Sequence, residues 1–174
     1  MNLIKIINFI KSFQNFIPLF SSLLACIFVT VPVSPTGSLM LLPMLGPAFA
    51  FYWSLYRFDL FSNWSAFIVG FFSDILYGTP LGIGPLLFIA LRELASRFSP
   101  HLMDTSFIFS WITASVSLFL YTVLSWLFIS IYFWSYSSIM PFLFQLILTI
   151  LLYPAISVLL RFIANFISSN EEVV

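Results

Sequence analysis

The sequence predicts an all-α integral membrane protein. Of its 174 residues, 61% are hydrophobic and 7% are charged, so the chain has too little polar surface for a fold that faces water on all sides. Its apolar residues form six runs, and its six Lys and Arg residues lie near alternate ends of those runs. Both features are typical of polytopic membrane proteins. We therefore expect residues 1–174 to form a single polytopic membrane domain.

The six apolar runs have the length of membrane-spanning helices. The hydrocarbon core of a bilayer is about 30 Å thick and takes about 20 helical residues. The candidate spans are approximately Asn15 to Val31, Leu39 to Tyr56, Leu60 to Tyr77, Leu81 to Phe98, Phe107 to Phe133 and Pro141 to Ile167. The connections contain residues that end helices, in order VPVSPTGS, RFDLFSN, GTPLG, SPHLMD and WSYSSIMP.

The first run also has some features of a lipoprotein signal. Lys5 and Lys11 precede an apolar stretch that contains Leu-Leu-Ala-Cys, ending at Cys26. However, the apolar run continues through Val29, and no soluble domain follows that would need an anchor. We therefore expect an uncleaved first transmembrane helix.

The basic residues predict the orientation. Lys and Arg favour the cytoplasmic side of a membrane. With six spans and both termini inside, all six basic residues fall at cytoplasmic helix ends, namely Lys5, Lys11, Arg57, Arg92, Arg97 and Arg161. Residues 1–14 then form a short cytoplasmic amino terminus and residues 168–174 a cytoplasmic tail. On the same side we expect Glu93 and Arg97 to pair, because they are four residues apart on a helix.

The third span contains a carboxylate within apolar sequence. Ser62, Ala66, Gly70 and Asp74 recur every four residues and lie broadly on one side of a helix. Small residues allow close approach of a neighbouring helix, and a charged side chain facing lipid would be unfavourable by several kcal/mol. Asp74 is therefore expected to point into the helix bundle.

The sequence is compatible with two roles for Asp74. The turn Gly78–Gly82 follows at once, and its free amides need acceptors if it lies at membrane depth. In the first role the carboxyl accepts hydrogen bonds from these amides and holds a helical hairpin together. In the second role Asp74 belongs to an ion, proton or substrate site.

The fifth span has small and hydroxyl side chains at helical spacing. Ser110, Ala114 and Ser117 form a candidate packing face, either for a partner helix or for a neighbouring helix of the same chain. The chain contains no HExxH, GxSxG or GxxxxGK[ST] motif. Cys26 is the single cysteine and no Cys/His cluster has metal-ligand spacing. We therefore expect no enzyme, no cofactor and no metal.

One block of the sequence resembles a known family. Residues Pro43 to Phe98 read PMLGPAFAFYWSLYRFDLFSNWSAFIVGFFSDILYGTPLGIGPLLFIALRELASRF. This block is similar to the central part of the rod shape-determining protein MreD family of bacteria, with a glycine, an intramembrane Asp and a G-x-P-L-G turn. The matching motif positions are Gly70, Asp74, Gly78, Pro80, Leu81 and Gly82. The chain departs from the family pattern at Phe58, where relatives often carry a proline, and at Gly84 and Pro85.

The resemblance implies a non-enzymatic component of the cell-elongation complex in the bacterial inner membrane. Such a protein helps organise lateral peptidoglycan synthesis through contacts with an MreC-like bitopic protein, indirectly with an MreB-like filament, and with a peptidoglycan polymerase and transpeptidase. The family is also similar in fold to the substrate-binding subunits of energy-coupling-factor transporters. The alternative function is therefore a subunit for small-molecule (vitamin) uptake, and an intramembrane enzyme acting on a lipid-linked substrate is a third possibility.

Overall fold

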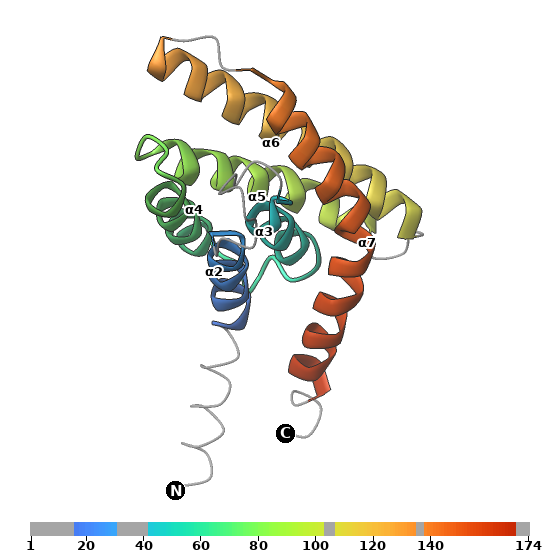
Figure 1. Ribbon diagram of the computed structural model, residues 1–174. Helices are drawn as coiled ribbons and strands as arrows, with labels where there is room; N and C mark the ends of the chain where they lie inside the picture. The colour runs from blue at the N-terminus through green and yellow to red at the C-terminus, as the bar shows by residue number, and fades with distance from the viewer. Residues whose placement is uncertain (1–15, 31–41, 103–106, 135–137, 170–174) are drawn as a thin grey trace, which may run out of the picture.

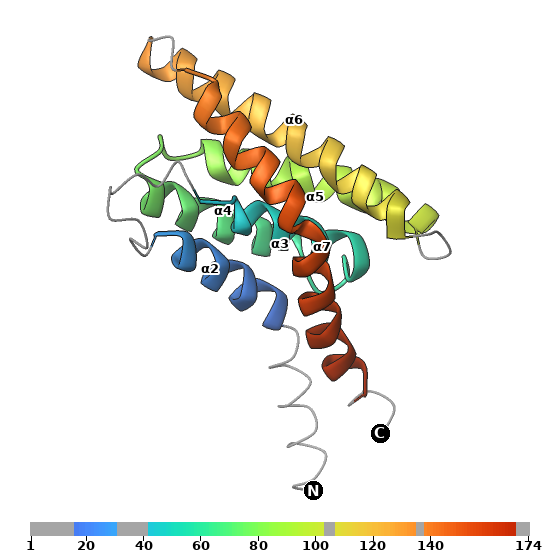
Figure 2. The same ribbon diagram turned by 45° about the vertical axis from the view of Figure 1, so that its right-hand side comes forward.

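The computed structural model describes residues 16–30, 42–102, 107–134 and 138–169. Within these ranges the chain is helical and contains no strand. The helices are α2 (Ile17–Thr30), α3 (Leu45–Tyr56), α4 (Asn63–Tyr77), α5 (Ile83–Leu102), α6 (Phe107–Phe133) and α7 (Met140–Ser169). In two views, α6 and the first half of α7 lie on one side of α3, α4 and α5, and α2 lies on the other (Figures 1 and 2).

Each predicted span corresponds to one helix, but four helices begin later than predicted, and α3 and α4 do so by three residues or more. The second was expected from Leu39; residues 39–41 lie outside the described ranges, and the helix begins at Leu45, after Pro43. The third was expected from Leu60 and begins at Asn63. The Ser62 side chain accepts a hydrogen bond from the Ser65 amide at 3.3 Å and caps this helix, as serine often does at this position.

Two helices have the length and hydropathy of a complete membrane span. These are α6 and the Met140–Asn165 part of α7. In contrast, α3 has 12 residues and α4 has 15, which correspond to lengths of about 18 Å and 22 Å, less than the roughly 30 Å of a hydrocarbon core. The structure thus has the six predicted helices, while only α6 and α7 meet the criteria for a complete span among the described residues.

The short helix α3 lies at the centre of the bundle. It contacts α2, α4, α5, α6 and α7, which explains why a 12-residue segment is buried nearly all round. The Phe51 ring meets the Tyr153 ring of α7 edge to face, with centroids 6.2 Å apart. The buried residues of α3 are Gly46, Pro47, Ala48, Ala50, Phe51, Tyr52, Trp53, Ser54 and Leu55.

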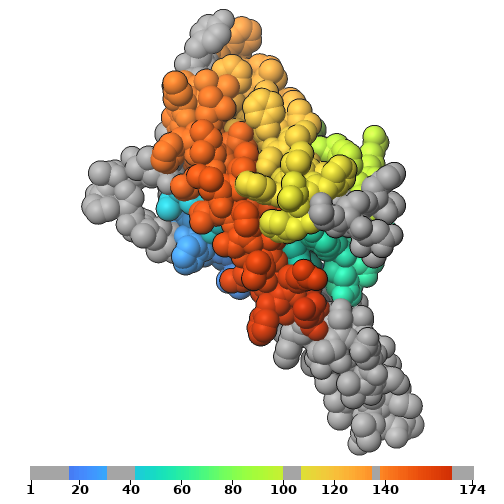
Figure 3. Space-filling view, turned by 90° about the vertical axis from the view of Figure 1, so that its right-hand side faces the viewer, coloured from blue at the N-terminus to red at the C-terminus, as the bar shows by residue number. Residues whose placement is uncertain are grey.

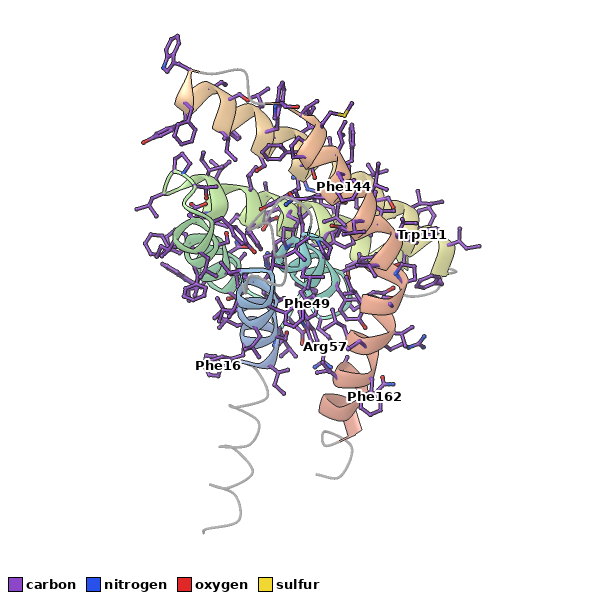
Figure 4. All side chains as sticks on the ribbon, in the orientation of Figure 1. Phe16, Phe49, Arg57, Trp111, Phe144 and Phe162 are labelled. Atoms are coloured by element: carbon purple, nitrogen blue, oxygen red, sulfur yellow. The ribbon has the colours of Figure 1, made fainter. Side chains whose placement is uncertain are left out.

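Polar side chains connect the helices inside this apolar bundle. The Trp53 indole donates to Ser21 Oγ of α2 at 2.8 Å. The Trp111 indole of α6, labelled in Figure 4, donates to the Ile150 carbonyl of α7 at 3.0 Å. Since an unpaired polar group in an apolar environment is unfavourable by several kcal/mol, these contacts fix which helix faces pack together.

Arg92 of α5 holds the connection between α3 and α4. Arg92 Nε donates to the Phe61 carbonyl at 2.6 Å, and its terminal nitrogen donates to the Phe58 carbonyl at 3.4 Å. The predicted Glu93–Arg97 pair is wrong: Glu93 pairs with Arg92 at 3.0 Å. Because the Arg92 guanidinium is already held over this connection, it presents its remaining nitrogen to the neighbouring carboxylate.

The helices α6 and α7 form much of one face of the molecule (Figure 3). Their outward side chains are large and apolar; Ile112 is 54% exposed and Phe162 is 78% exposed. Figure 1 shows that α7 changes direction along its length, and it contains Pro154, which removes a helical hydrogen bond and favours a kink. A bilayer would cover such a face without a partner protein.

Candidate functional site

The helix α4 turns its small residues and its carboxyl group toward α5. Ala66 and Asp74 are 0% and 2% exposed, and Gly70 is also buried. Ser62, the first member of the predicted stripe, is exposed and lies just before the helix as its cap. The prediction that Asp74 points into the bundle is therefore confirmed.

The Asp74 carboxyl accepts hydrogen bonds from three donors. Oδ1 accepts from the Thr79 hydroxyl at 2.7 Å, and Oδ2 accepts from the Gly82 amide at 2.9 Å. The Gly84 amide lies 3.0 Å from both oxygens. The predicted acceptor contact with the turn is confirmed at Gly82, and it extends beyond the turn to Gly84. The carboxyl thus joins the end of α4 to the start of α5.

Two glycines give the turn its shape. Gly78 follows α4 with φ 66° and ψ 26°, the left-handed conformation that commonly ends helices, and its amide donates to the Asp74 carbonyl. Gly82 has φ 109°, which residues with a Cβ rarely adopt. This conformation directs the Gly82 amide to the carboxyl, so a glycine at position 82 is required by the backbone.

Gly70 and Gly84 allow the backbones of α4 and α5 to touch. A Cβ atom added at Gly70 would lie 2.5 Å from the Pro85 nitrogen and 2.6 Å from the Gly84 carbonyl oxygen. A Cβ at Gly84 would collide with the Gly70 carbonyl oxygen and lie 2.6 Å from Asp74 Oδ1. Only glycine fits at this crossing, because both nearest neighbours are backbone.

The structure accounts for the residue type at most of the six motif positions, but not at all of them. Gly70, Asp74, Gly78 and Gly82 have the contacts or conformations described above, and the Pro80 carbonyl accepts from the Ile83 amide at 3.3 Å. In contrast, Leu81 is 67% exposed, and nothing in the site accounts for its identity. Sequence reasoning missed two participants, Thr79 within the predicted turn and Gly84 two residues after it. The available signal was Gly84 itself, a further glycine at the start of the next helix.

The candidate packing face of α6 lies inside the chain. Ser110, Ala114 and Ser117 are 3%, 0% and 1% exposed. Ser110 Oγ lies 2.8 Å from the Tyr56 hydroxyl of α3, whereas Ser117 Oγ has no hydrogen-bond partner among the described residues. Of the two predicted alternatives, the burial fits packing within the chain and leaves no access for a partner helix at these positions.

Replacing Ala114 with Phe is therefore expected to destabilise the protein itself. The added ring has no space between α6 and its neighbours, and overpacking of this kind is unfavourable by about 1 to 3 kcal/mol or more. The measurement is the fraction of protein that stays monodisperse in detergent after heating. The matched control is Val116→Phe, at a position on α6 that is 54% exposed and is expected to tolerate the same ring. Equal stability of the two variants would contradict this packing.

A cavity of about 260 Å³ adjoins the turn. It lies between the end of α2, the start of α3, the end of α4, the second half of α6 and the start of α7. A smaller void of about 50 Å³ is lined by Asp74 and Gly84 and shares five lining residues with the cavity. These shared residues are Tyr77, Thr79, Tyr121, Ser125 and Ile129.

The chemistry of the site is that of a hydrogen-bond acceptor. All three donors to Asp74 are uncharged groups. The described residues contain no group of three or more His, Cys, Asp and Glu side chains that could hold a metal ion. The arrangement stabilises the junction of α4 and α5.

Comparison with known proteins identifies the family. Searches of curated proteins and of solved structures gave no match. The family model described as rod shape-determining protein MreD matches residues 9–163, which include every helix discussed above except the end of α7. The match covers far more of the chain than the central block Pro43 to Phe98 on which the resemblance rested. The chain belongs to the MreD family of rod shape-determining proteins.

Proposed function

We propose that this protein is a multi-pass inner-membrane component of the cell-elongation complex that helps organise lateral peptidoglycan synthesis. The observation that carries the proposal is the family match over residues 9–163. Its proposed partners are an MreC-like bitopic protein, a peptidoglycan polymerase and transpeptidase and, indirectly, an MreB-like filament. The protein would act through helix contacts and without catalysis.

The geometry around Asp74 supports a scaffold role. A carboxyl acting as a general base needs a free lone pair directed at the substrate proton. Both oxygens of Asp74 instead accept hydrogen bonds from the chain's own groups, and the side chain is 2% exposed. In the proposed role, the motif preserves the shape of the α4–α5 hairpin, which partners recognise.

The proposed topology has six membrane-embedded helices with both termini in the cytoplasm. Its support is that α2 begins and α7 ends on the same side in both views (Figures 1 and 2). Arg92 of α5 also donates hydrogen bonds to carbonyl groups of the α3–α4 connection. The basic part of α5 and this connection therefore lie at the same end of the bundle. Helices too short to span alone, such as α3, would be embedded through their neighbours.

Reporter fusions test this topology. Alkaline phosphatase, which is active only in the periplasm, is expected to be inactive when fused at Asn2 or Val174, and a fluorescent protein that folds only in the cytoplasm is expected to be bright at both positions. A phosphatase fusion after Gly78, in the connection assigned to the outside, serves as the positive control. Active phosphatase at either terminus would refute the six-helix orientation.

Depletion followed by microscopy tests the function. Loss of the protein is expected to turn rods into rounded, swelling cells, and expression of the intact chain is expected to restore width and length. Recovery of a tagged MreC-like protein with this chain, after solubilisation in mild detergent, is the direct measure of partnership. Normal shape after complete depletion would contradict the proposal.

The alternative is a substrate-binding subunit for vitamin uptake, with a fold similar to that of energy-coupling-factor subunits. The observation that favours it is the 260 Å³ cavity, although typical ligand pockets are about 300 to 1,000 Å³. Uptake assays during the same depletion separate the two functions. A vitamin requirement with normal cell shape would support the alternative and exclude the elongation role.

A further inference from the structure

The cavity beside the α4–α5 turn, here called the α6–α7 cavity, has a mixed lining. Apolar side chains come from several helices and include Val29, Met44, Ile129 and Phe142. The four hydroxyl-bearing side chains of the lining also line the smaller void next to Asp74. The complete lining is Val29, Pro43, Met44, Pro47, Tyr77, Thr79, Tyr121, Ser125, Ile129, Phe142 and Gln145.

Two hydroxyl groups in this cavity have no hydrogen-bond partner among the residues that the structure describes. Tyr121 and Ser125 are four residues apart on α6, so they share one face of the helix. Within the described ranges neither hydroxyl makes a hydrogen bond. Both line the large cavity and the smaller void. A hydroxyl left unpaired in an apolar environment is unfavourable, so these groups favour an occupant that can donate or accept a hydrogen bond.

Two further hydroxyls in the lining can form hydrogen bonds with an occupant of the cavity. Thr79 uses its proton on Asp74 at 2.7 Å and keeps lone pairs that can accept. Tyr77 donates to the Cys26 carbonyl at 3.4 Å, a long contact that a closer acceptor could replace. The cavity thus offers several hydroxyl groups at one side of an apolar space.

The lining of the cavity is uncharged and does not suit most ionic ligands. The lining contains no Lys, Arg or His that could pair with a carboxylate or phosphate. The nearest acid, Asp74, lines only the smaller void, and its oxygens already accept from Thr79, Gly82 and Gly84. A cation would therefore compete with three hydrogen bonds that hold the hairpin.

We propose that the α6–α7 cavity is a binding site for an uncharged, hydroxyl-bearing amphiphile, whose hydroxyls contact Tyr121, Ser125 and Thr79 and whose apolar part lies against Ile129, Met44 and Phe142. The glycerol end of a neutral lipid and a free polyol share the hydroxyl chemistry. The apolar majority of the lining favours the lipid. This site goes beyond the proposed role in cell elongation and does not depend on it.

The site is tested by protection of an introduced thiol in the purified protein in nanodiscs. Ile129→Cys places the thiol in the cavity while leaving Tyr121 and Ser125 in place. The reagent is N-ethylmaleimide, and the unmodified chain, whose Cys26 is buried, gives the background. Monooctanoylglycerol is the probe. Octanoate tests whether a charged head group on the same acyl chain also binds, and glycerol tests whether the hydroxylated head group binds without the chain. Ile131→Cys, at a position of α6 that is 61% exposed, controls for general effects of the probes on the membrane.

Monooctanoylglycerol is expected to slow labelling of the Ile129→Cys protein saturably, by at least about fivefold, and to leave Ile131→Cys unaffected. Octanoate is expected to give no protection. Adding Tyr121→Phe and Ser125→Ala is expected to raise the half-protecting concentration by about tenfold, since two hydrogen bonds to the probe are lost. Protection by glycerol alone at the same concentrations would support the site and assign it to a free polyol.

Three results would overturn the proposal. They are equal protection by octanoate, full protection in the protein lacking both hydroxyls, and no protection by either hydroxylated probe. Should the Ile129→Cys protein not fold, Phe142→Cys on α7 provides a second position in the same cavity. Cell shape is not measured in this experiment, so its failure leaves the proposed elongation role unaffected.

Discussion

Replacing Asp74 with leucine is expected to lower the amount of folded protein in the membrane several-fold and to abolish restoration of rod shape. Leucine has nearly the same size but no acceptor, so the Gly82 and Gly84 amides lose their partner. A buried unpaired amide is unfavourable by about 1 to 3 kcal/mol, and a change of about 1 to 2 kcal/mol already alters cellular abundance several-fold. Immunoblots of membranes and microscopy of a depleted strain give the two measurements.

Replacing Asp74 with asparagine is expected to have a mild effect on abundance and function, because the Thr79 hydroxyl can adjust to the new side chain. Asparagine keeps one acceptor oxygen, which can face the Gly82 and Gly84 amides where Oδ2 now lies. Its NH2 group then meets the Thr79 hydroxyl, which can rotate from donating to accepting. Asp74→Asn should therefore retain most abundance and function.

The double variant separates a hydrogen-bond role from a charge role. Thr79→Val alone removes one contact and should be tolerated, whereas Asp74→Asn combined with Thr79→Val leaves the asparagine NH2 group unpaired and should lose abundance by more than the sum of the two. If charge is the essential property, Asp74→Asn alone would be inactive while accumulating normally. An abundant but inactive Asp74→Asn protein would move Asp74 from a structural group to an ion or proton site.

Gly70→Ala and Gly84→Ala are expected to disrupt the hairpin through a single added methyl group each. The new Cβ would lie against backbone atoms of the facing helix, 2.5 Å from the Pro85 nitrogen in the first case. Backbone cannot move aside as a flexible side chain can, so α4 and α5 must separate and the contacts of Asp74 with Gly84 must lengthen. Both variants should lose most of the monodisperse protein after detergent extraction.

Gly78→Ala is the matched control for these two variants. Nothing lies within 4 Å of a Cβ at Gly78, although its φ of 66° is left-handed. Its expected penalty is the conformational one, about 1 to 2 kcal/mol, and Gly78→Asn should reduce it because asparagine tolerates this conformation. If Gly70→Ala proved as stable as Gly78→Ala, close approach of the two backbones would not be a requirement of the fold.

The composition and the order of residues were enough to predict the helical elements and the environment of Asp74. Hydrophobic run lengths located all six helices, because an apolar segment needs internal hydrogen bonding in a bilayer wherever it lies in the bundle. The Ser62, Ala66, Gly70, Asp74 spacing predicted a buried carboxyl, because residues four apart share a helix face, although Ser62 itself is an exposed cap before the helix. These properties depend on local sequence alone.

Only the tertiary structure decided which groups meet across helices. Sequence spacing favoured Glu93 with Arg97, but Arg92 is held over Phe61 by a contact between distant segments and takes Glu93 instead. In the same way, the start of α5 brings Gly84 to Asp74, and the arrangement of α6 and α7 leaves Tyr121 and Ser125 facing a cavity. The family match shows membership in a rod-shape family. The sequence by itself thus determined which segments are helical and which faces are apolar, whereas packing between helices decided the hydrogen-bond partners, because those distances depend on how the whole chain is arranged.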